Sequence, residues 1–80
     1  MNEFEDLPSI EPGVYRHYKG NEYQVLGVGC HTEAHEYYVV YAPKNPKDGQ
    51  PKLWVRPYGM FIEMVEVNGK AVPRFERLQG

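Results

Sequence analysis

Several side chains that can bind a metal ion or act in catalysis are concentrated in one short stretch of the chain. They are a thiol, imidazoles and carboxylates: Cys30, His31, Glu33 and His35, with His17 and Glu36 elsewhere. All three groups are metal ligands, and a tight turn would bring several of them together. The spacing matches no standard zinc pattern, however, and a second Cys or His pair is lacking. We therefore expect a polar hairpin turn with Cys30 buried at its base, and no metal.

Cys30 is also a candidate nucleophile, which a histidine base would have to activate. Adjacent side chains of a strand point to opposite faces, so Cys30 and His31 would meet only if a turn begins there. His17 or His35 could serve instead, although nothing in the sequence fixes that geometry. A lone cysteine beside glycines in an apolar strand is usually a small core residue. We therefore expect no enzyme activity and no cofactor.

The segment from Lys52 to Arg56 has the composition of a ligand-binding strand. Alternation along a strand sends Leu53 and Val55 to one face, and Lys52, Trp54 and Arg56 to the other. We predict that the aliphatic pair fills the core while the indole and the two cations face outward. An indole between cations is typical of surfaces that stack bases and contact phosphates. The alternative is that Trp54 is itself a core ring, around which Lys52 and Arg56 extend to solvent.

Further aromatic and basic residues are candidates for the same surface. In the run from Glu36 to Ala42, alternation places Tyr38 and Val40 opposite the other Tyr and Val residues. Because both faces are apolar, this strand is either buried on both sides or exposes an aromatic face. The candidate ligand-binding residues are Trp54, Arg56, Lys52, Arg16, His17, Lys19, Tyr38 and Arg74, with Lys70 as a further source of charge nearby.

Short strands must position these residues, because Gly and Pro interrupt every stretch that could form a long helix. Asn68-Gly69 is the preferred sequence of a two-residue hairpin turn. Gly27 and Gly29 predict a bend or bulge within one strand. The expected strands are 14–18, 23–30, 36–42, 53–56, 64–67 and 70–72, with a single helical or 3₁₀ turn over 58–62.

The loop over 43–51 distinguishes two fold classes. Its three prolines and Gly49 exclude a helix. An OB-fold often has a helix at this point, whereas an SH3-like barrel needs only a loop. We therefore predict an all-β fold, a small SH3-like barrel of five to six strands with a short 3₁₀ turn.

Length and charge predict one domain over 13–80, preceded by a flexible acidic tail over 1–12. The tail holds four acids and no base, and a helical turn through Phe4, Leu7 and Ile10 is the alternative. The remaining residues hold nine Lys and Arg against seven Asp and Glu, far from the charge of a dedicated DNA-binding domain. The single cysteine, with no signal peptide or membrane-spanning run, favours the cytoplasm.

A series of spaced motifs runs through residues 13–78. They are GVYRHYKG over 13–20, Tyr23, HTE over 31–33, VVY over 39–41, LWVRP over 53–57, Met60-Phe61 with Glu63, and VPRF over 72–75. Together these motifs resemble the bacterial domain of unknown function 1653 (DUF1653). The resemblance implies an SH3-type barrel, for which a nucleic-acid-binding role has been suggested. The residues that fall in the motifs are His17, Tyr18, Lys19, His31, Glu33, Trp54, Arg56, Phe61, Arg74 and Phe75.

Three hypotheses follow from these observations. The first is a non-enzymatic, monomeric binding module without a membrane partner, which binds single-stranded RNA or DNA through an aromatic and basic surface. The second is a peptide- or protein-binding barrel that receives an extended segment in an aromatic groove or at a strand edge. The third is a small enzyme or metal site built on His17, Cys30, His31, Glu33 and His35.

Overall fold

The computed structural model describes residues 8–48 and 52–79 of the chain, and this part is all-β with one short helix. The predicted fold class is therefore confirmed. The elements are β1 (Gly13–His17), β2 (Glu22–His31), β3 (Glu36–Pro43), β4 (Trp54–Pro57), α1 (Tyr58–Phe61), β5 (Met64–Val67), β6 (Lys70–Pro73) and β7 (Phe75–Gln79). No helix among these residues is long and apolar enough to cross a membrane.

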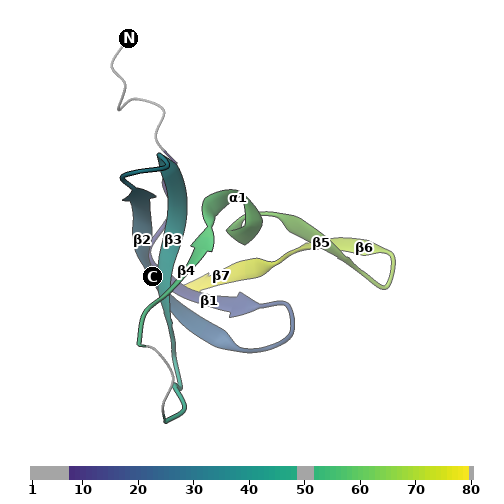
Figure 1. Ribbon diagram of the computed structural model, residues 1–80. Coiled ribbons are helices and arrows are strands. Elements are labelled where there is room, and N and C mark those ends of the chain that lie inside the picture. The colour runs from purple at the N-terminus through teal and green to yellow at the C-terminus, as the bar shows by residue number, and fades with distance from the viewer. Residues whose placement is uncertain (1–7, 49–51, 80) are drawn as a thin grey trace.

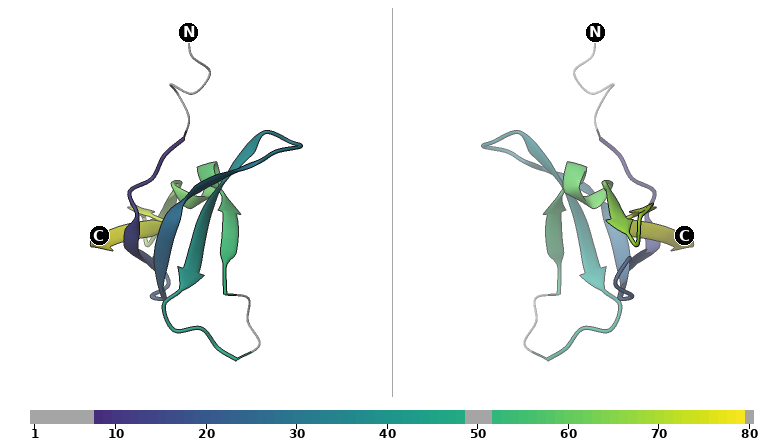
Figure 2. Two further views of the ribbon diagram at one scale, coloured as in Figure 1. Left: turned by 90° about the vertical axis from the view of Figure 1, so that its left-hand side faces the viewer. Right: turned by 90° about the vertical axis from the view of Figure 1, so that its right-hand side faces the viewer.

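The strands form one large sheet and one separate hairpin. Five strands pair antiparallel in the order β4-β3-β2-β1-β7, while β5 pairs only with β6. Figure 1 shows β5 and β6 extending away from the five-stranded sheet, and Figure 2 shows the curvature of that sheet from two sides. Among the described residues β4 and β7 are the two edge strands and do not pair with each other. The closed barrel that we expected is therefore not shown.

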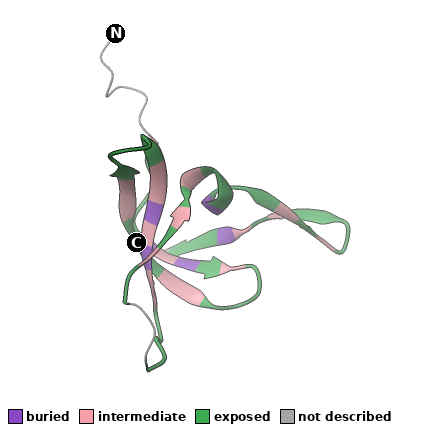
Figure 3. Ribbon diagram, in the orientation of Figure 1, coloured by how far each residue is buried: buried purple, intermediate pink, exposed green. Residues whose placement is uncertain are grey.

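One face of the five-stranded sheet, which we call the inner face, carries the core beneath α1. The buried side chains are Tyr15, Val25, Val39, Tyr41, Phe61 and Phe75, four of them aromatic. Large rings each remove much apolar surface from water, so a few of them can form the core of so small a domain. The ring of Phe61 in α1 stacks on that of Phe75 with 3.9 Å between centroids. Figure 3 shows the buried segments where the strands converge under α1.

Two local predictions based on glycine are confirmed. The β2–β3 register shifts between Val25 and Gly27, which is the irregularity expected in β2. Asn68 and Gly69 both have positive φ, at 52° and 81°. A type I′ turn requires this backbone at both central residues, and it joins β5 to β6.

The strand β7 was not predicted, and the reason lies at Pro73 and Arg74. A proline cannot donate a ladder hydrogen bond, so the sequence indicates an end of regular structure there. In the structure the Arg74 N–H donates to the Glu63 carbonyl (3.0 Å), and the Arg74 carbonyl accepts from the Tyr18 N–H (2.9 Å). These two bonds redirect the chain from the hairpin into the sheet, where β7 pairs with β1.

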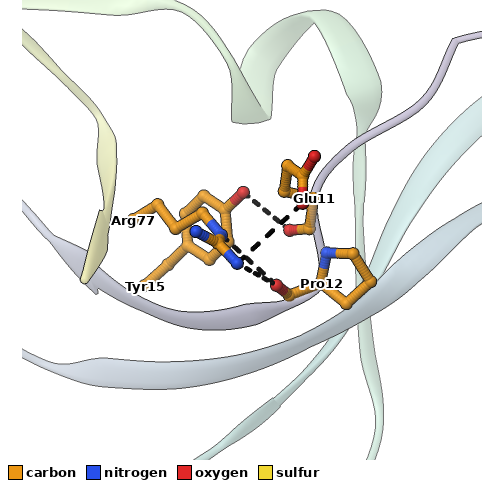
Figure 4. Close-up of polar contacts among 4 residues, drawn as sticks. All are labelled: Glu11, Pro12, Tyr15 and Arg77. Carbon is orange, nitrogen blue, oxygen red and sulfur yellow. Dashed lines mark hydrogen bonds and ion pairs between the residues drawn. The ribbon is translucent and has the colours of Figure 1, made fainter. Parts of the chain in front are cut away.

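The described part of the predicted tail, residues 8–12, is held against the domain. The Tyr15 hydroxyl donates to the Glu11 carbonyl at 2.8 Å, and the Arg77 guanidinium donates to the Pro12 carbonyl at 3.0 and 3.3 Å (Figure 4). The Glu11 carboxylate also lies 3.9 Å from Arg77. Burial raises the pKa of Tyr15, so its hydroxyl stays a donor at neutral pH.

The same segment has a second anchor in α1. The Tyr58 hydroxyl donates to the Ser9 carbonyl at 3.1 Å, and Ile10 packs against the core. The expectation of a loose tail is therefore wrong for residues 8–12, because its carbonyls are the acceptors for two tyrosine hydroxyls. The alternative of a helical turn is not found in these residues either. Residues 1–7 lie outside the described part of the chain.

Candidate binding surface

The alternation predicted for the strand around Trp54 is present, but its two faces are exchanged. The side chains of Leu53 and Val55 are 58% and 61% exposed, whereas Trp54 and Arg56 are half-buried. Trp54 is paired directly with the buried Tyr41 of the neighbouring strand β3, and directly paired residues share a face of the sheet. The prediction that Leu53 and Val55 fill the core while Trp54 and Arg56 face outward was wrong.

The size of the indole explains the exchange. Its ring lies 6.2 Å from that of Tyr23 and 6.3 Å from that of Tyr41, so it extends the aromatic core. Burying an indole removes more apolar area from water than burying a valine, and stabilises the fold more. Arg56, two residues further along β4, lies on the same face as Trp54. Its guanidinium carbon lies 5.3 Å from the centroid of Phe75, and its Nε donates to the Tyr41 hydroxyl at 3.4 Å.

Five rings form a continuous series along the inner face, which we call the ring row. The row consists of Trp54, Tyr23, Phe75, His17 and Tyr18, with successive centroids 6.2, 5.9, 4.9 and 4.6 Å apart. Phe75 is buried, Tyr18 is exposed, and the other three are half-buried. The row is thus anchored in the core at its centre, Phe75, and reaches solvent on both sides of that ring.

Three cations flank the His17 end of the ring row. Arg56 lies beside Phe75, the Lys19 ammonium lies 5.9 Å from the Tyr18 centroid, and Arg74 directly precedes Phe75. Arg74 makes a 2.6 Å ion pair with Glu63. Within the described residues, no carboxylate is within ion-pair distance of Arg56 or Lys19. The charge around this end of the row is therefore positive.

The protonation state of His17 follows from these neighbours. Burial lowers the pKa of His17, and the positive charges of Arg56, Arg74 and Lys19 lower it further. The Nδ1 of His17 accepts the backbone N–H of Lys19 at 3.1 Å. At neutral pH the ring is uncharged, with its proton on Nε2, because Nδ1 is the acceptor.

The surface is hollowed at both ends of the ring row. At the Trp54 end a hollow of about 200 Å³ is lined by Asn21, Glu22, Tyr23, Pro43, Asn45, Lys47 and Trp54. At the other end a hollow of about 370 Å³ is lined by Arg16, His17, Tyr18, Gly20, Val67, Val72, Pro73 and Glu76. The first is rich in amide and charged side chains, and the second lies between the β1–β2 turn and the hairpin.

The family comparison covers all of this surface. A family model described as "Protein of unknown function (DUF1653)" matches residues 13–77. The chain belongs to the DUF1653 family. A crystal structure of a DUF1653 protein from Bordetella bronchiseptica is 36% identical, with a TM-score of 0.77 over 86% of this chain and 87% of that one. No curated protein matches the chain. The resemblance read from the sequence motifs is confirmed, and the family name assigns no activity.

The structure brings together only part of the predicted set of ligand-binding residues in this DUF1653 domain. Trp54, Arg56, His17, Lys19 and Arg74 lie on or beside the ring row. Arg16 lines the hollow at the His17 end, but it forms an exposed ion pair with Glu76 (3.4 Å). The others lie away from the row: Tyr38 donates to Glu36 (2.8 Å) on the opposite face, Lys52 is exposed ahead of β4, and Lys70 lies on the separate hairpin.

The cluster around Cys30 also differs from expectation. Cys30 is exposed rather than buried at the base of its turn, because this end of β2 extends past the part of the sheet that the core covers. His31 shapes the turn, since its Nδ1 accepts the Ala34 N–H at 3.1 Å. Among residues 8–48 and 52–79, no three His, Cys, Asp or Glu side chains converge where a metal ion could bind.

Sequence reasoning missed the two rings at the centre of the row. Tyr23 was assigned to a strand without a role, and Phe75 was known only as a motif residue, because no strand was predicted around it. Phe75 contacts Phe61, His17, Tyr23, Tyr41 and Arg56. An aromatic residue two positions after a proline in a β-rich chain was the available signal.

The opposite, outer face of the sheet has an apolar area beside β4. A shallow hollow of about 420 Å³ is lined there by Gly29, Cys30, His31, Tyr38, Val40 and Val55. Leu26 in β2 is 51% exposed. Gly29 has no side chain to cover the neighbouring Val40. This part of the outer face therefore presents aliphatic groups beside the edge strand β4.

Proposed function

We propose that this DUF1653 domain is a non-enzymatic, monomeric module of the cytoplasm that binds single-stranded nucleic acid along its inner face. Bases stack on the exposed parts of Trp54, Tyr23 and Tyr18, and phosphates contact Arg56, Lys19 and Arg74. The observation that carries the proposal is the ring row with cations beside it. The single cysteine in the chain supports a reducing compartment.

Physical arguments favour this ligand for such a surface. Every base has a π-face, so aromatic side chains stack bases with little sequence preference, at about 1–3 kcal/mol per base. The chain has a net charge of −2, so attraction to phosphates must come from the local cations. With three such contacts, the logarithm of the affinity should fall with the logarithm of salt concentration with a slope of about −2.

The test uses the only tryptophan of the chain as its reporter. RNA and DNA single strands of about ten nucleotides, within the site sizes typical of such domains, are titrated at low salt while indole fluorescence and oligonucleotide anisotropy are recorded. We expect quenching of Trp54 together with a rise in anisotropy. No binding at high micromolar protein would contradict the proposal.

Variants separate the two kinds of contact. Arg56→Gln combined with Lys19→Gln should make the salt slope shallower by about 1.4, because two phosphate contacts are lost. Lys70→Gln on the hairpin removes the same type of charge away from the row and is the matched control. Binding that is unchanged by Trp54→Ala and Arg56→Ala together would also contradict the proposal.

A second candidate function is supported by the outer face. An extended peptide could add to the free edge of β4 and place apolar side chains over Val40 and Val55. Such binding would depend little on salt, and Val55→Arg would abolish it. The Arg56 and Lys19 variants would leave it unchanged, so the two candidates give opposite results in the same assay.

A further inference from the structure

The ion pairs of the described residues are distributed unevenly over the domain. Elsewhere, three cations each face one carboxylate: Arg16 faces Glu76, Lys44 faces Glu22, and Arg77 faces Glu11. At the His17 end of the ring row, Glu63 is the ion-pair partner of Arg74, and the other two cations there, Arg56 and Lys19, have no carboxylate among the described residues within ion-pair distance. Three cations with one carboxylate leave two positive charges in this place. We call this set, together with His17, the cationic end.

The backbone and the core fix the geometry of the cationic end. The rings of His17 and Phe75 are 4.9 Å apart, and the Arg56 guanidinium lies 5.3 Å from the same Phe75 ring. Arg74 is held by its backbone bonds to Tyr18 and Glu63. The Nε of Arg74 is buried and has no hydrogen-bond partner among the described residues. Buried donors of this kind are normally satisfied, so a further acceptor is expected close by.

His17 supplies a directed donor without adding charge. Its Nδ1 is occupied by the Lys19 N–H, so Nε2–H is the donor that remains. A neutral imidazole does not repel the neighbouring cations, as an imidazolium would. The cationic end therefore combines three positive charges with one neutral N–H donor.

We propose that the cationic end binds the terminal phosphate of a single strand in preference to internal phosphates. A terminal phosphomonoester carries a charge of about −1.5 to −2 at neutral pH. An internal phosphodiester carries one negative charge. The monoester matches the two excess positive charges left by Glu63, whereas a diester leaves one of them uncompensated. The Glu76 carboxylate, which also lines the adjoining hollow, is paired with Arg16 and adds no net charge.

This inference rests on the proposed function but is tested separately from it. Oligonucleotides of one sequence are prepared with a 5′-phosphate, with a 3′-phosphate, and with both ends as hydroxyls. We expect one of the phosphorylated strands to bind about tenfold more tightly than the hydroxyl form, which corresponds to about 1.4 kcal/mol. Lys19→Gln, an exposed substitution, should weaken the binding of all three strands, and that of the preferred phosphorylated strand most, so that most of the tenfold difference is lost. Lys70→Gln is the control and should preserve the full preference.

The outcomes separate the two proposals. Equal binding of all three strands overturns the terminal-phosphate inference and leaves nucleic-acid binding in place. Failure of every strand to bind overturns both. A preference that survives in Lys19→Gln and also in Arg56→Gln overturns the assignment to the cationic end. For both variants, the fluorescence of Trp54 in the free protein shows whether the fold is retained.

Discussion

The two faces of the five-stranded sheet differ although the same strands build both. The inner face combines the ring row, the core and three cations, while the outer face carries exposed Val55, Leu26 and a hollow beside glycine. In β4 the contrast separates adjacent residues, since Trp54 and Arg56 belong to one face and Val55 to the other. Alternation decides which side chains share a face, and ring volume decides which face becomes the core.

The largest expected effect is the loss of the ring at the centre of the inner face. Phe75→Ala should destabilise the domain by about 3–5 kcal/mol, because a buried aromatic leaves a cavity among its neighbours. For a small domain this is a large fraction of the total. Urea unfolding measures it. Leu78→Ala, an exposed position in the same strand, is the control and should cost about 0.5 kcal/mol or less. Equal costs would remove the distinction between the faces.

The adjacent residues Trp54 and Val55 test the comparison within one strand. Trp54→Ala should cost about 2–3 kcal/mol of stability, somewhat less than a fully buried ring. It should also weaken oligonucleotide binding by about tenfold, as the loss of one stacked base implies. Val55→Thr keeps the β-branched shape and should change both quantities little. A larger effect at Val55 than at Trp54 would instead support the orientation predicted from the sequence, in which Val55 faces the core.

The pH dependence of stability should report the cationic end. The pKa of His17 is lowered in the folded domain, so near an ordinary pKa of about 6.5 the unfolded chain takes up a proton that the folded chain does not. Stability is therefore complete above that pH and falls as the pH is lowered through and below it. His17→Gln should remove this part of the decline in urea unfolding curves. An identical pH dependence in the variant would contradict the assignment.

The smallest effect is expected on the outer face, at Gly29. A Cβ added there would meet only Val40 Cγ2, at 3.5 Å, which is ordinary contact. Gly29→Ala should stabilise the domain by about 0.4–1 kcal/mol, because the unfolded chain loses freedom. Gly20→Ala is the matched control. Its surroundings are open, but its φ of +117° strains any other residue, so this substitution should destabilise. A loss of stability at Gly29 would mean that the outer face is tightly packed.

Much of the fold could be predicted from local sequence. The Asn68-Gly69 turn, the irregularity near Gly27 and the helical turn before β5 depend on a few neighbouring residues, and all three are present. β7 could not be predicted, because it depends on two hydrogen bonds of Arg74 to segments distant in the chain.

The candidate site was predictable in part of its membership but not in its orientation. Trp54, Arg56, His17, Lys19 and Arg74 were chosen by type, and they lie on or beside one row. Which face of the sheet Trp54 and Arg56 occupy depended on whether the indole of Trp54 or the aliphatic pair Leu53 and Val55 fills the core. Such competition is decided by packing across strands, which periodicity does not encode. The ring of Phe75 joins the two halves of the site, and only the pairing of β7 with β1 places it there.

Because residues 8–12 are anchored to the domain, the folded unit begins before the segment that the family model matches. The family match starts at residue 13, yet the carbonyls that accept from Tyr15 and Tyr58 belong to Glu11 and Ser9. In a fragment that begins at residue 13, the hydroxyls of Tyr15 and Tyr58 would lose their acceptors. The apolar core surface that Ile10 covers would become exposed. Homology boundaries would thus be a poor guide for excising this domain.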